Sequence, residues 1–426
     1  MNLLAQIWQS ETLRKKVFYT ILILVVYRIL VQISVPGVDI DGVREFFTSG
    51  ENSVFSMYSM LTGGAMEKFS ILMMGLAPYI NASIIMQLMT VVVPKLESLQ
   101  KEGDAGQKKI NFYTRILTVI FAIGQSYGVL YYIGSNIPSV NLGNIYDVLP
   151  LMLVITAGTM LLVWLGEQIT EKGLGNGISL IIFASIVSNI PTIFSNILGS
   201  VGSITGDTGK LIPFVVFLAL VIVLVILTIL ATEGQRRIPV NYGTGGQSMA
   251  SNLPIRVLQA GMIPIIFALS LVTFPSVILQ MVQPENSPVA DFITQNLNPA
   301  SSSPYFFAIY TALIVFFSYF YVSIVFKTEE IAENIQKRGG FIPGYRPGRE
   351  TAEHLSDVSF RLNLWGGLFL AFVAIIPMVF TLFSGTLTSQ DLIVSGSGII
   401  IIVGVVLDLI RRINDQLVTQ DYDKLK

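Results

Sequence analysis

Side chains that could do chemistry are scarce in the apolar parts of this 426-residue chain. Within its long uncharged runs the one clear mid-segment charge is Arg28, and Asp408 lies near the end of the last run. A carrier coupled to protons or sodium ions generally needs carboxylates near the middle of the membrane to hold the coupling ion. Their scarcity counts against ion-coupled transport of a small solute. We expect Arg28 to be paired or to extend toward the membrane surface.

Signals for catalysis or for a bound cofactor are also missing. The chain has no cysteine and one histidine, His354, which excludes thiolate sites and multi-histidine metal sites. Gly209-Lys210-Leu211 lacks the upstream glycine and the Ser/Thr of a phosphate-binding P-loop. The glycine-rich GLGNGIS at Gly173–Ser179 has no strand before it, which favours a tight turn into a helix. The sequence therefore predicts a protein that is not an enzyme and needs no cofactor or metal.

A short apolar piece precedes a longer one near the N-terminus. The first, Val54–Met66, is broken by Gly63-Gly64 and is too short to cross a bilayer core, which needs roughly 20 apolar residues. The second, Phe69–Pro94, is long enough, yet Pro78, Asn81 and Gln87 lie inside it. Such a pair of segments is typical of chain that lines a cavity. We expect Pro78, and Pro264 in a later run, to bend their helices.

Composition places the chain in a bilayer. It is 52% hydrophobic and only 12% charged, whereas soluble domains carry about 25% charged residues. Long, nearly uncharged runs predict ten membrane-spanning helices. The runs are Val17–Ile33, Ile71–Val93, Ile116–Ile133, Val148–Leu165, Ile178–Ile193, Leu211–Ala231, Val257–Met281, Tyr305–Phe326, Leu364–Phe383 and Leu392–Ile410.

The loops between these runs alternate in charge. Twenty-two of the 26 lysines and arginines fall in one set of loops and three in the other, with Arg28 inside the first run. By the positive-inside rule, both termini and the basic loops are cytoplasmic. The N-terminus imitates a signal peptide, but no small-residue cleavage site follows the first run, so we expect an uncleaved first span.

The ten predicted spans divide into two halves of five. Because five is an odd number, two structurally related halves would run in opposite directions across the membrane. We expect an N-terminal half at 1–198, an external hinge loop at 199–210 and a C-terminal half at 211–426. Cytoplasmic loops follow at 233–256 and 327–361, beside the earlier loop Leu99–Lys109. The charges of these loops fit two interpretations equally well on physical grounds. They set the topology, or they form a docking surface for a cytosolic partner.

Several motifs resemble the SecY/Sec61-alpha family, whose bacterial members form the central subunit of the protein-conducting channel. They are SMLTGGAMEKFSILMMGLAPYINASIIMQL, QKEGDAGQKKI, WLGEQITEKGLGNGISLIIFASIV, EGQRRIPVNY, AGMIPIIFALSLVTFP and GFIPGYRPGRET. The resemblance covers essentially the whole chain. It implies an all-α membrane protein, with ten helices in two inverted five-helix halves around a central hourglass pore.

The resemblance also implies roles for individual residues. It implies an aliphatic pore ring of Leu76, Ile80, Ile178, Ile182, Ile266 and Ile401. It implies a plug at about 54–68 that includes Met57, Met60, Leu61, Thr62, Gly63, Gly64 and Ala65, with the two glycines giving it room to swing. Our candidates for polar contacts at a lateral gate between spans 2/3 and 7/8 are Gln87, Gln125 and Ser270. The docking residues would be Arg236, Arg237, Arg346 and Arg349.

One stretch departs from the family pattern. After IPVNY the family usually has a longer, strongly basic loop, but here GTGGQSMASNLP brings no basic residue until Arg256. The partners implied are the SecE and SecG subunits, the motor ATPase SecA, the ribosome with its RNA, signal peptides and preproteins, and membrane lipid.

The function implied is passage of unfolded secretory polypeptides across the bacterial cytoplasmic membrane, with sideways release of hydrophobic segments into lipid. Two other classes remain as alternatives, a secondary carrier for an amphipathic solute and a passive membrane scaffold. The scarcity of embedded carboxylates argues against the carrier, and the half-length apolar piece and the kinked helices argue against the scaffold.

Overall fold

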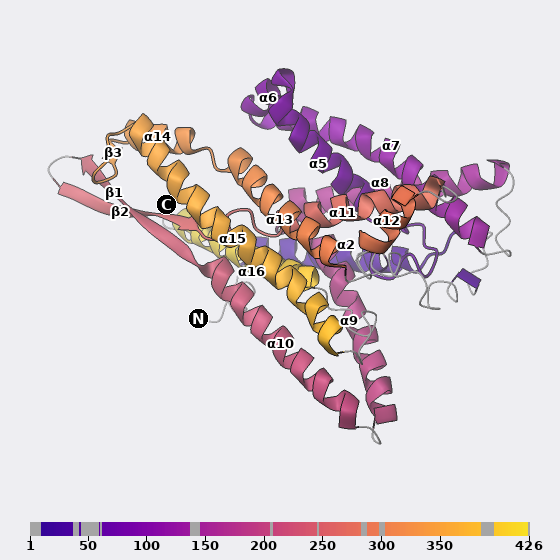
Figure 1. Cartoon of the computed structure of the whole chain (residues 1–426). Coiled ribbons are helices and arrows are strands. Elements are labelled where there is room, and N and C mark those ends of the chain that lie inside the picture. The colour runs from indigo at the N-terminus through magenta and orange to yellow at the C-terminus, as the bar shows by residue number, and fades with distance from the viewer. Residues whose placement is uncertain are drawn as a thin grey trace.

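The computed structural model describes residues 10–36, 42–43, 59, 62–136, 145–204, 208–244, 247–282, 288–297, 303–384 and 396–424. These residues form mainly long helices, with a small sheet at one end of the molecule (Figure 1). Each of the ten predicted apolar runs contains one long helix. The helices are α2 (Glu11–Val31), α5 (Ala77–Val92), α7 (Asp104–Asn136), α8 (Ile145–Lys172), α9 (Gly177–Ile204), α10 (Thr208–Glu233), α11 (Ile263–Val282), α13 (Pro304–Val325), α15 (Arg349–Ser384) and α16 (Gly396–Lys424).

Several of these helices could cross a membrane by length and composition. Among the described residues, α7, α8, α10, α13 and α15 each contain a sufficiently long apolar stretch. Helix α5 adds a sixth if it is joined to α6 (Pro94–Lys101), from which it is bent by 98°. Helices α9 and α11 contain shorter apolar stretches, Gly177–Pro191 and Ile263–Pro275. The chain is thus a multi-pass membrane protein, and the number of ten spans stays a prediction.

Pro78 and Pro264 lie at the starts of helices, so the prediction that they bend their helices is wrong. Helix α5 begins at Ala77 and α11 begins at Ile263, which puts each proline in a first turn. The missing N–H of a first-turn proline would have no partner within the helix anyway, so no bond is lost there. The sharp bend falls instead between α5 and α6, where Pro94 opens the second helix.

The GLGNGIS motif turns tightly into α9, as the sequence predicts. The Asn176 side-chain oxygen accepts hydrogen bonds from the backbone N–H groups of Ile178, at 3.1 Å, and Ser179, at 3.3 Å. This is a helix N-cap, which satisfies backbone donors that have no partner within the helix. Gly177 packs directly on Gly166 of α8, where a Cβ on Gly177 would overlap the Gly166 carbonyl oxygen. The contact between the two glycines sets the position of α9 against α8.

The predicted external hinge at 199–210 is mostly helical. Helix α9 continues to Ile204 and α10 begins at Thr208. The helices therefore occupy most of the segment expected to be a loop, and residues 205–207 lie outside the described residues. A hinge between the two halves stays a prediction.

Two predicted cytoplasmic loops join in one sheet, so the expectation of an all-α fold is wrong in this region. Strands β1 (Gln235–Thr244) and β2 (Gln247–Arg256) pair antiparallel along their whole length, and β3 (Gly340–Phe341) pairs with the other edge of β1. Side chains from the sheet pack against α14 (Thr328–Lys337) and α15. The buried members of this cluster are Ile238, Val240, Ile255, Ile335, Ile342, Leu355 and Val358. The loop at Leu99–Lys109 is also largely helical, because α6 ends at Lys101 and α7 begins at Asp104.

The two largest hydrophobic clusters divide broadly along the chain. One is built mainly from α10, α11, α13, α15 and α16, together with Ile84 of α5. The other is built mainly from α2, α8 and α9, together with Ile401 and Val405 of α16. Ile80 and Met262 pack against both clusters. The junction between the clusters therefore passes through α5 and the start of α11.

Gly177→Ala is expected to destabilise the protein by about 1–3 kcal/mol or more, because the added Cβ forces α9 away from Gly166. Gly124→Ala in α7 is the matched control, since a Cβ there meets nothing within 4 Å. That change is expected to be neutral or stabilising by up to about 1 kcal/mol, through helix propensity alone. Thermal unfolding of the purified protein in detergent measures both. Equal shifts in the two variants would contradict the close approach of α8 and α9.

Candidate functional site

A small cavity of about 50 Å³ lies at the junction between the two clusters. Its lining is apolar except for three hydroxyl-bearing residues. The lining residues are Thr62, Leu76, Ala77, Ile80, Ile182, Ile266, Leu269, Ser270, Thr273 and Ile401. Five of the six predicted ring residues are among them. The structure therefore brings together, around one cavity, aliphatic side chains that are far apart in the sequence.

Four helices position these aliphatic side chains. Leu76 is the N-cap residue of α5, and Ile80 lies one turn further along. Ile182, Ile266 and Ile401 come from α9, α11 and α16. Helices from both predicted halves thus contribute to one lining.

Ile178 is the sixth predicted ring residue, and it does not line this cavity. It lies one turn before Ile182 in α9, where a Cβ on Gly166 would approach its Cδ1 atom to 2.6 Å. Ile178 is half-buried and packs with the cluster formed by α2, α8 and α9. Its side chain lies beside Gly166 of α8 rather than in the cavity.

Sequence reasoning missed Leu269 and Thr273, which also line the cavity. Both lie in α11 at helical spacing from Ile266 and Ser270, so all four fall on one face of the helix. That spacing was readable from the sequence once Ile266 and Ser270 had been chosen. The two hydroxyl groups, of Ser270 and Thr273, make the α11 side the more polar side of the lining.

A buried segment without regular helix, Thr62–Leu76, closes one side of the cavity. Its backbone is paired with the end of α2 and with itself. The Val35 N–H donates to the Phe69 carbonyl at 2.9 Å, and the Ile71 N–H donates to the Ile33 carbonyl at 3.0 Å. Irregular backbone at membrane depth is tolerated only where protein or water satisfies it. These bonds satisfy that requirement for the part of the segment nearest α2.

The predicted plug lies partly outside the described residues. Met57, Met60 and Leu61 belong to the part that is not described, whereas Thr62, Gly63, Gly64 and Ala65 are described and buried. Gly63 and Gly64 have φ angles of 69° and 81°, in the left-handed region that favours glycine. Here the glycines form a buried turn. Their freedom to swing stays a prediction.

The three candidate gate residues lie on helices that pack together, since α11 contacts both α5 and α7. Ser270 lines the cavity, and Gln87 of α5 is half-buried. Gln125 of α7 is buried, and its side-chain Nε2 has no hydrogen-bond partner in the described part of the chain. A buried amide without a partner costs about 1–3 kcal/mol. Gln125 therefore carries a polar group inside the bundle that no described partner satisfies.

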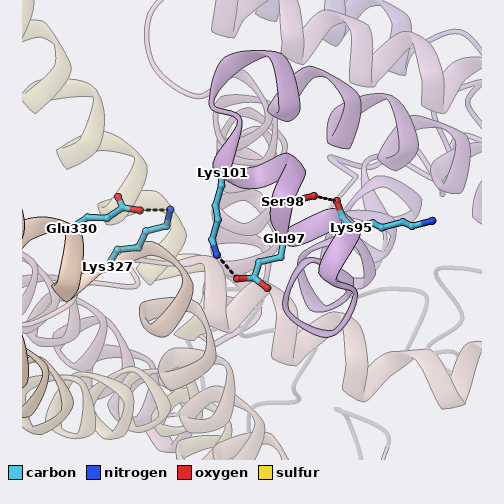
Figure 2. A network of polar contacts seen from close by, with 6 residues as sticks. All are labelled: Lys95, Glu97, Ser98, Lys101, Lys327 and Glu330. Atoms are coloured by element: carbon cyan, nitrogen blue, oxygen red, sulfur yellow. Dashed lines mark hydrogen bonds and ion pairs between the residues drawn. The ribbon is translucent and has the colours of Figure 1, made fainter.

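The end of α6 and the start of α14 each carry an ion pair. Figure 2 shows two ion pairs there, Lys101 to Glu97 at 2.7 Å and Lys327 to Glu330 at 2.8 Å. The hydrogen bond from Lys101 to Glu97 raises the pKa of Lys101, and the charges of Glu329 and Glu330 on α14 act in the same direction. Elements from the two predicted halves are thus close enough here for their charges to interact.

The four predicted docking arginines are all exposed. Arg236 and Arg237 lie on β1, and Arg346 and Arg349 lie between β3 and the start of α15. Glu350 and Thr351 hold this turn. The Arg346 N–H donates to the Glu350 carboxylate at 3.1 Å, and the Thr351 hydroxyl donates to the Arg346 carbonyl at 2.8 Å. Because β3 pairs with β1, the two arginine pairs belong to one substructure.

These features define a class, a multi-pass helical membrane protein with a small apolar cavity where its two largest hydrophobic clusters meet. The family profile of SecY matches residues 70–410. A protein translocase subunit SecY from Corynebacterium glutamicum is 42% identical over the full length of both chains. One from Streptomyces coelicolor is 38% identical over 98% of each. This chain belongs to the SecY family.

Solved structures show the same fold. One described as the structure of a protein conducting channel matches with a TM-score of 0.67 at 16% identity, covering 94% of this chain and 92% of that one. Sec61 in a canine ribosome-channel complex matches with a TM-score of 0.62 at 16% identity, over 94% and 92% of the two chains.

Gly75→Ala is expected to destabilise the buried segment by about 1–3 kcal/mol, because Gly75 has a φ of 55° and a Cβ there would meet the Thr62 Cγ2 methyl at 2.7 Å. Thr62→Ser removes that methyl and keeps the hydroxyl. The double variant should therefore regain part of the loss, measured by thermal unfolding of the purified protein. If Thr62→Ser lowers stability equally with and without the Gly75 change, the two residues are not in contact.

Proposed function

We propose that this chain is the pore-forming subunit of a protein-conducting channel. It passes unfolded secretory polypeptides across the cytoplasmic membrane and releases hydrophobic segments sideways into lipid. The observation that carries the proposal is the small apolar cavity, lined by α5, α9, α11 and α16 and bounded by a buried irregular segment. The curated relatives, named protein translocase subunit SecY, support it over the whole chain.

The aliphatic lining suits a pore that must close without binding its substrate. A cavity of about 50 Å³ admits a few water molecules at most and no polypeptide. Aliphatic side chains around such a constriction exclude water and therefore block ions. They also lack fixed polar partners, so they can yield to any side chain of a passing polypeptide. We assign this ring to Leu76, Ile80, Ile182, Ile266 and Ile401, with Ile178 as a flanking residue.

The irregular segment is proposed to be the plug, and the seam between α5/α7 and α11/α13 the lateral gate. A solved structure whose description assigns the SecY plug to stabilising the closed state has the same fold as this chain, with a TM-score of 0.67. Thr62 touches the cavity from the segment, so the segment must move before a polypeptide can pass. The unpartnered amide of Gln125 makes the seam easier to part than a fully apolar one.

The cytoplasmic sheet and its arginines are proposed to dock the partner that drives translocation, either the motor ATPase SecA or the ribosome. A structural neighbour is described as a ribosome-channel complex, which supports the second of these. Both termini are proposed to be cytoplasmic, in a bacterial cytoplasmic membrane. The SecE and SecG subunits are the expected membrane partners.

The rival function, a secondary carrier for an amphipathic solute, is less well supported. Among the described residues no group of three or more His, Asp or Glu side chains could hold a metal ion. Asp408, the carboxylate nearest to an apolar helix end, pairs with Arg412 at 2.9 Å. A coupling-ion site would need carboxylates in the bundle interior.

A cysteine placed at Ile80 or Ile401 is expected to crosslink to a secretory polypeptide stalled in transit. The cysteine-free sequence makes each introduced thiol unique. Ile222→Cys on α10 is the control, because Ile222 is 52% exposed on the outer surface of the bundle. Crosslinking is read as a mass shift of the labelled polypeptide on a gel. If only Ile222→Cys crosslinks, the ring does not surround the translocation path.

Gln125→Leu is expected to impair translocation of precursors with weakly hydrophobic signal sequences by about tenfold, with little effect on strongly hydrophobic ones. The change removes the unpartnered amide, which strengthens the closed seam by about 1–3 kcal/mol. Gln107→Leu is the matched control, since Gln107 lies at the exposed start of α7. Protease protection of the two precursor classes in proteoliposomes measures the effect. Equal or better transport of the weak class by Gln125→Leu would contradict the gate assignment.

A further inference from the structure

Two neighbouring residues of α2, Tyr27 and Arg28, donate hydrogen bonds to the buried segment at Thr62-Gly63. The Tyr27 hydroxyl donates to the Thr62 carbonyl at 3.2 Å, and the Arg28 guanidinium donates to the Gly63 carbonyl at 3.0 Å. Tyr27 is 1% exposed, so its contact is shielded from solvent. The two acceptors are the backbone carbonyls of consecutive residues, so these hydrogen bonds do not depend on the segment's side chains.

The same two residues also bind α9. The Tyr27 hydroxyl lies 2.6 Å from the Ser185 hydroxyl, and the Arg28 guanidinium donates to the Ser188 hydroxyl at 2.9 Å. Each α2 side chain thus joins one backbone carbonyl of the segment to one serine of α9.

The fit around Gly63 is tight. A Cβ on Gly63 would lie 2.9 Å from the Arg28 guanidinium, 3.1 Å from the Ser188 hydroxyl and 3.1 Å from the Tyr27 hydroxyl. The left-handed φ of Gly63 aims its carbonyl into this group. Only glycine can adopt this backbone conformation and also fit the space left by these three side chains. The site is therefore built for one backbone turn rather than for a variable side chain.

Helix α9 connects this contact to the cavity. Ser185 lies one turn beyond Ile182, on the same face of α9. Ile182 lines the cavity. Displacement of Ile182 by a polypeptide in the cavity would shift α9 and with it Ser185 and Ser188, which lie within two turns of Ile182 on the same helix.

We infer that Tyr27, Arg28, Ser185 and Ser188 form a latch that holds the segment at Thr62-Gly63 closed, and that widening of the cavity releases it through α9. Tyr27 and Arg28 are positioning residues, and they act on the path only through the segment. The inference rests on the proposed function, because it takes this segment to be the plug. Arg28 thereby acquires a role beyond the pairing expected from the sequence.

The test uses Thr62→Cys as a single-cysteine reporter, since the latch binds the Thr62 carbonyl and not its side chain. The channel with its partner subunits is reconstituted in vesicles, and a membrane-impermeant maleimide is added to each side in turn. Tyr27→Phe is expected to raise the labelling rate about fivefold, the factor given by about 1 kcal/mol of lost hydrogen bonding. Arg28→Gln should raise the labelling rate in the same direction and also increase the resting chloride leak.

Tyr19→Phe is the matched control. The Tyr19 hydroxyl of the same helix donates to the Gln168 side chain of α8 at 3.4 Å and does not contact the segment. Its labelling rate should equal that of the parent. Equal labelling of Tyr27→Phe and Tyr19→Phe would overturn the latch, even if Arg28→Gln fails to fold.

A stalled precursor tests the coupling through α9. With a polypeptide in the cavity the latch should already be open, so the difference between Tyr27→Phe and the parent should vanish. An undiminished difference would refute release through α9. Precursor transport by the unmodified chain is measured separately. If the unmodified chain transports no precursor, the proposed function is wrong. The labelling rates would still show whether Tyr27 and Arg28 hold the segment at Thr62-Gly63.

Discussion

A backbone polar group left unpaired in hydrocarbon costs several kcal/mol, and much of this structure follows from that constraint. A helix pairs nearly all of its backbone N–H and C=O groups internally. The buried segment Thr62–Leu76 cannot, because it runs through turns. Its amides and carbonyls therefore need partners from the surrounding protein. The chain just after α2 supplies backbone partners at Ile33 and Val35, and the C-terminal part of α2 supplies side chains. The helices enclose the segment because it could not exist in lipid without them.

Enclosure of this segment also explains the close helix contacts around it. Gly158 of α8 packs on the Ile71 carbonyl so closely that a Cβ would overlap it. Gly166 and Gly177 allow α9 to pack against α8 and present Ile182 to the cavity. In membrane bundles small residues permit such approaches where larger ones would separate the helices. The apolar lining and the irregular segment are thus parts of one packing arrangement.

Much of the fold was predictable from the sequence, because apolar runs and cap residues are local signals. Each predicted run contains a helix, and Asn176 caps α9 where a turn into a helix was expected. Residues such as Ile80 and Ile401 could be chosen only by resemblance, since an isoleucine facing lipid and one facing a cavity look the same in one sequence. The partners of Arg28 were beyond reach, because they depend on a turn at Gly63 and on a helix far along the chain. The pairing of β3 with β1 was beyond reach for the same reason, since β3 lies far from β1 in sequence, whereas the hairpin of β1 and β2 is local and was simply missed.

The small sheet ties together the ends of α11 and α13. Strand β2 leads into α11, and α13 leads through α14 into β3, while β1 pairs with both strands. Helices α11 and α13 also pack against each other along their length. The pair is therefore bound at its end as well as along its sides. Because the sheet is joined in sequence to both helices, a displacement of the sheet is expected to be transmitted to α11 and α13 together.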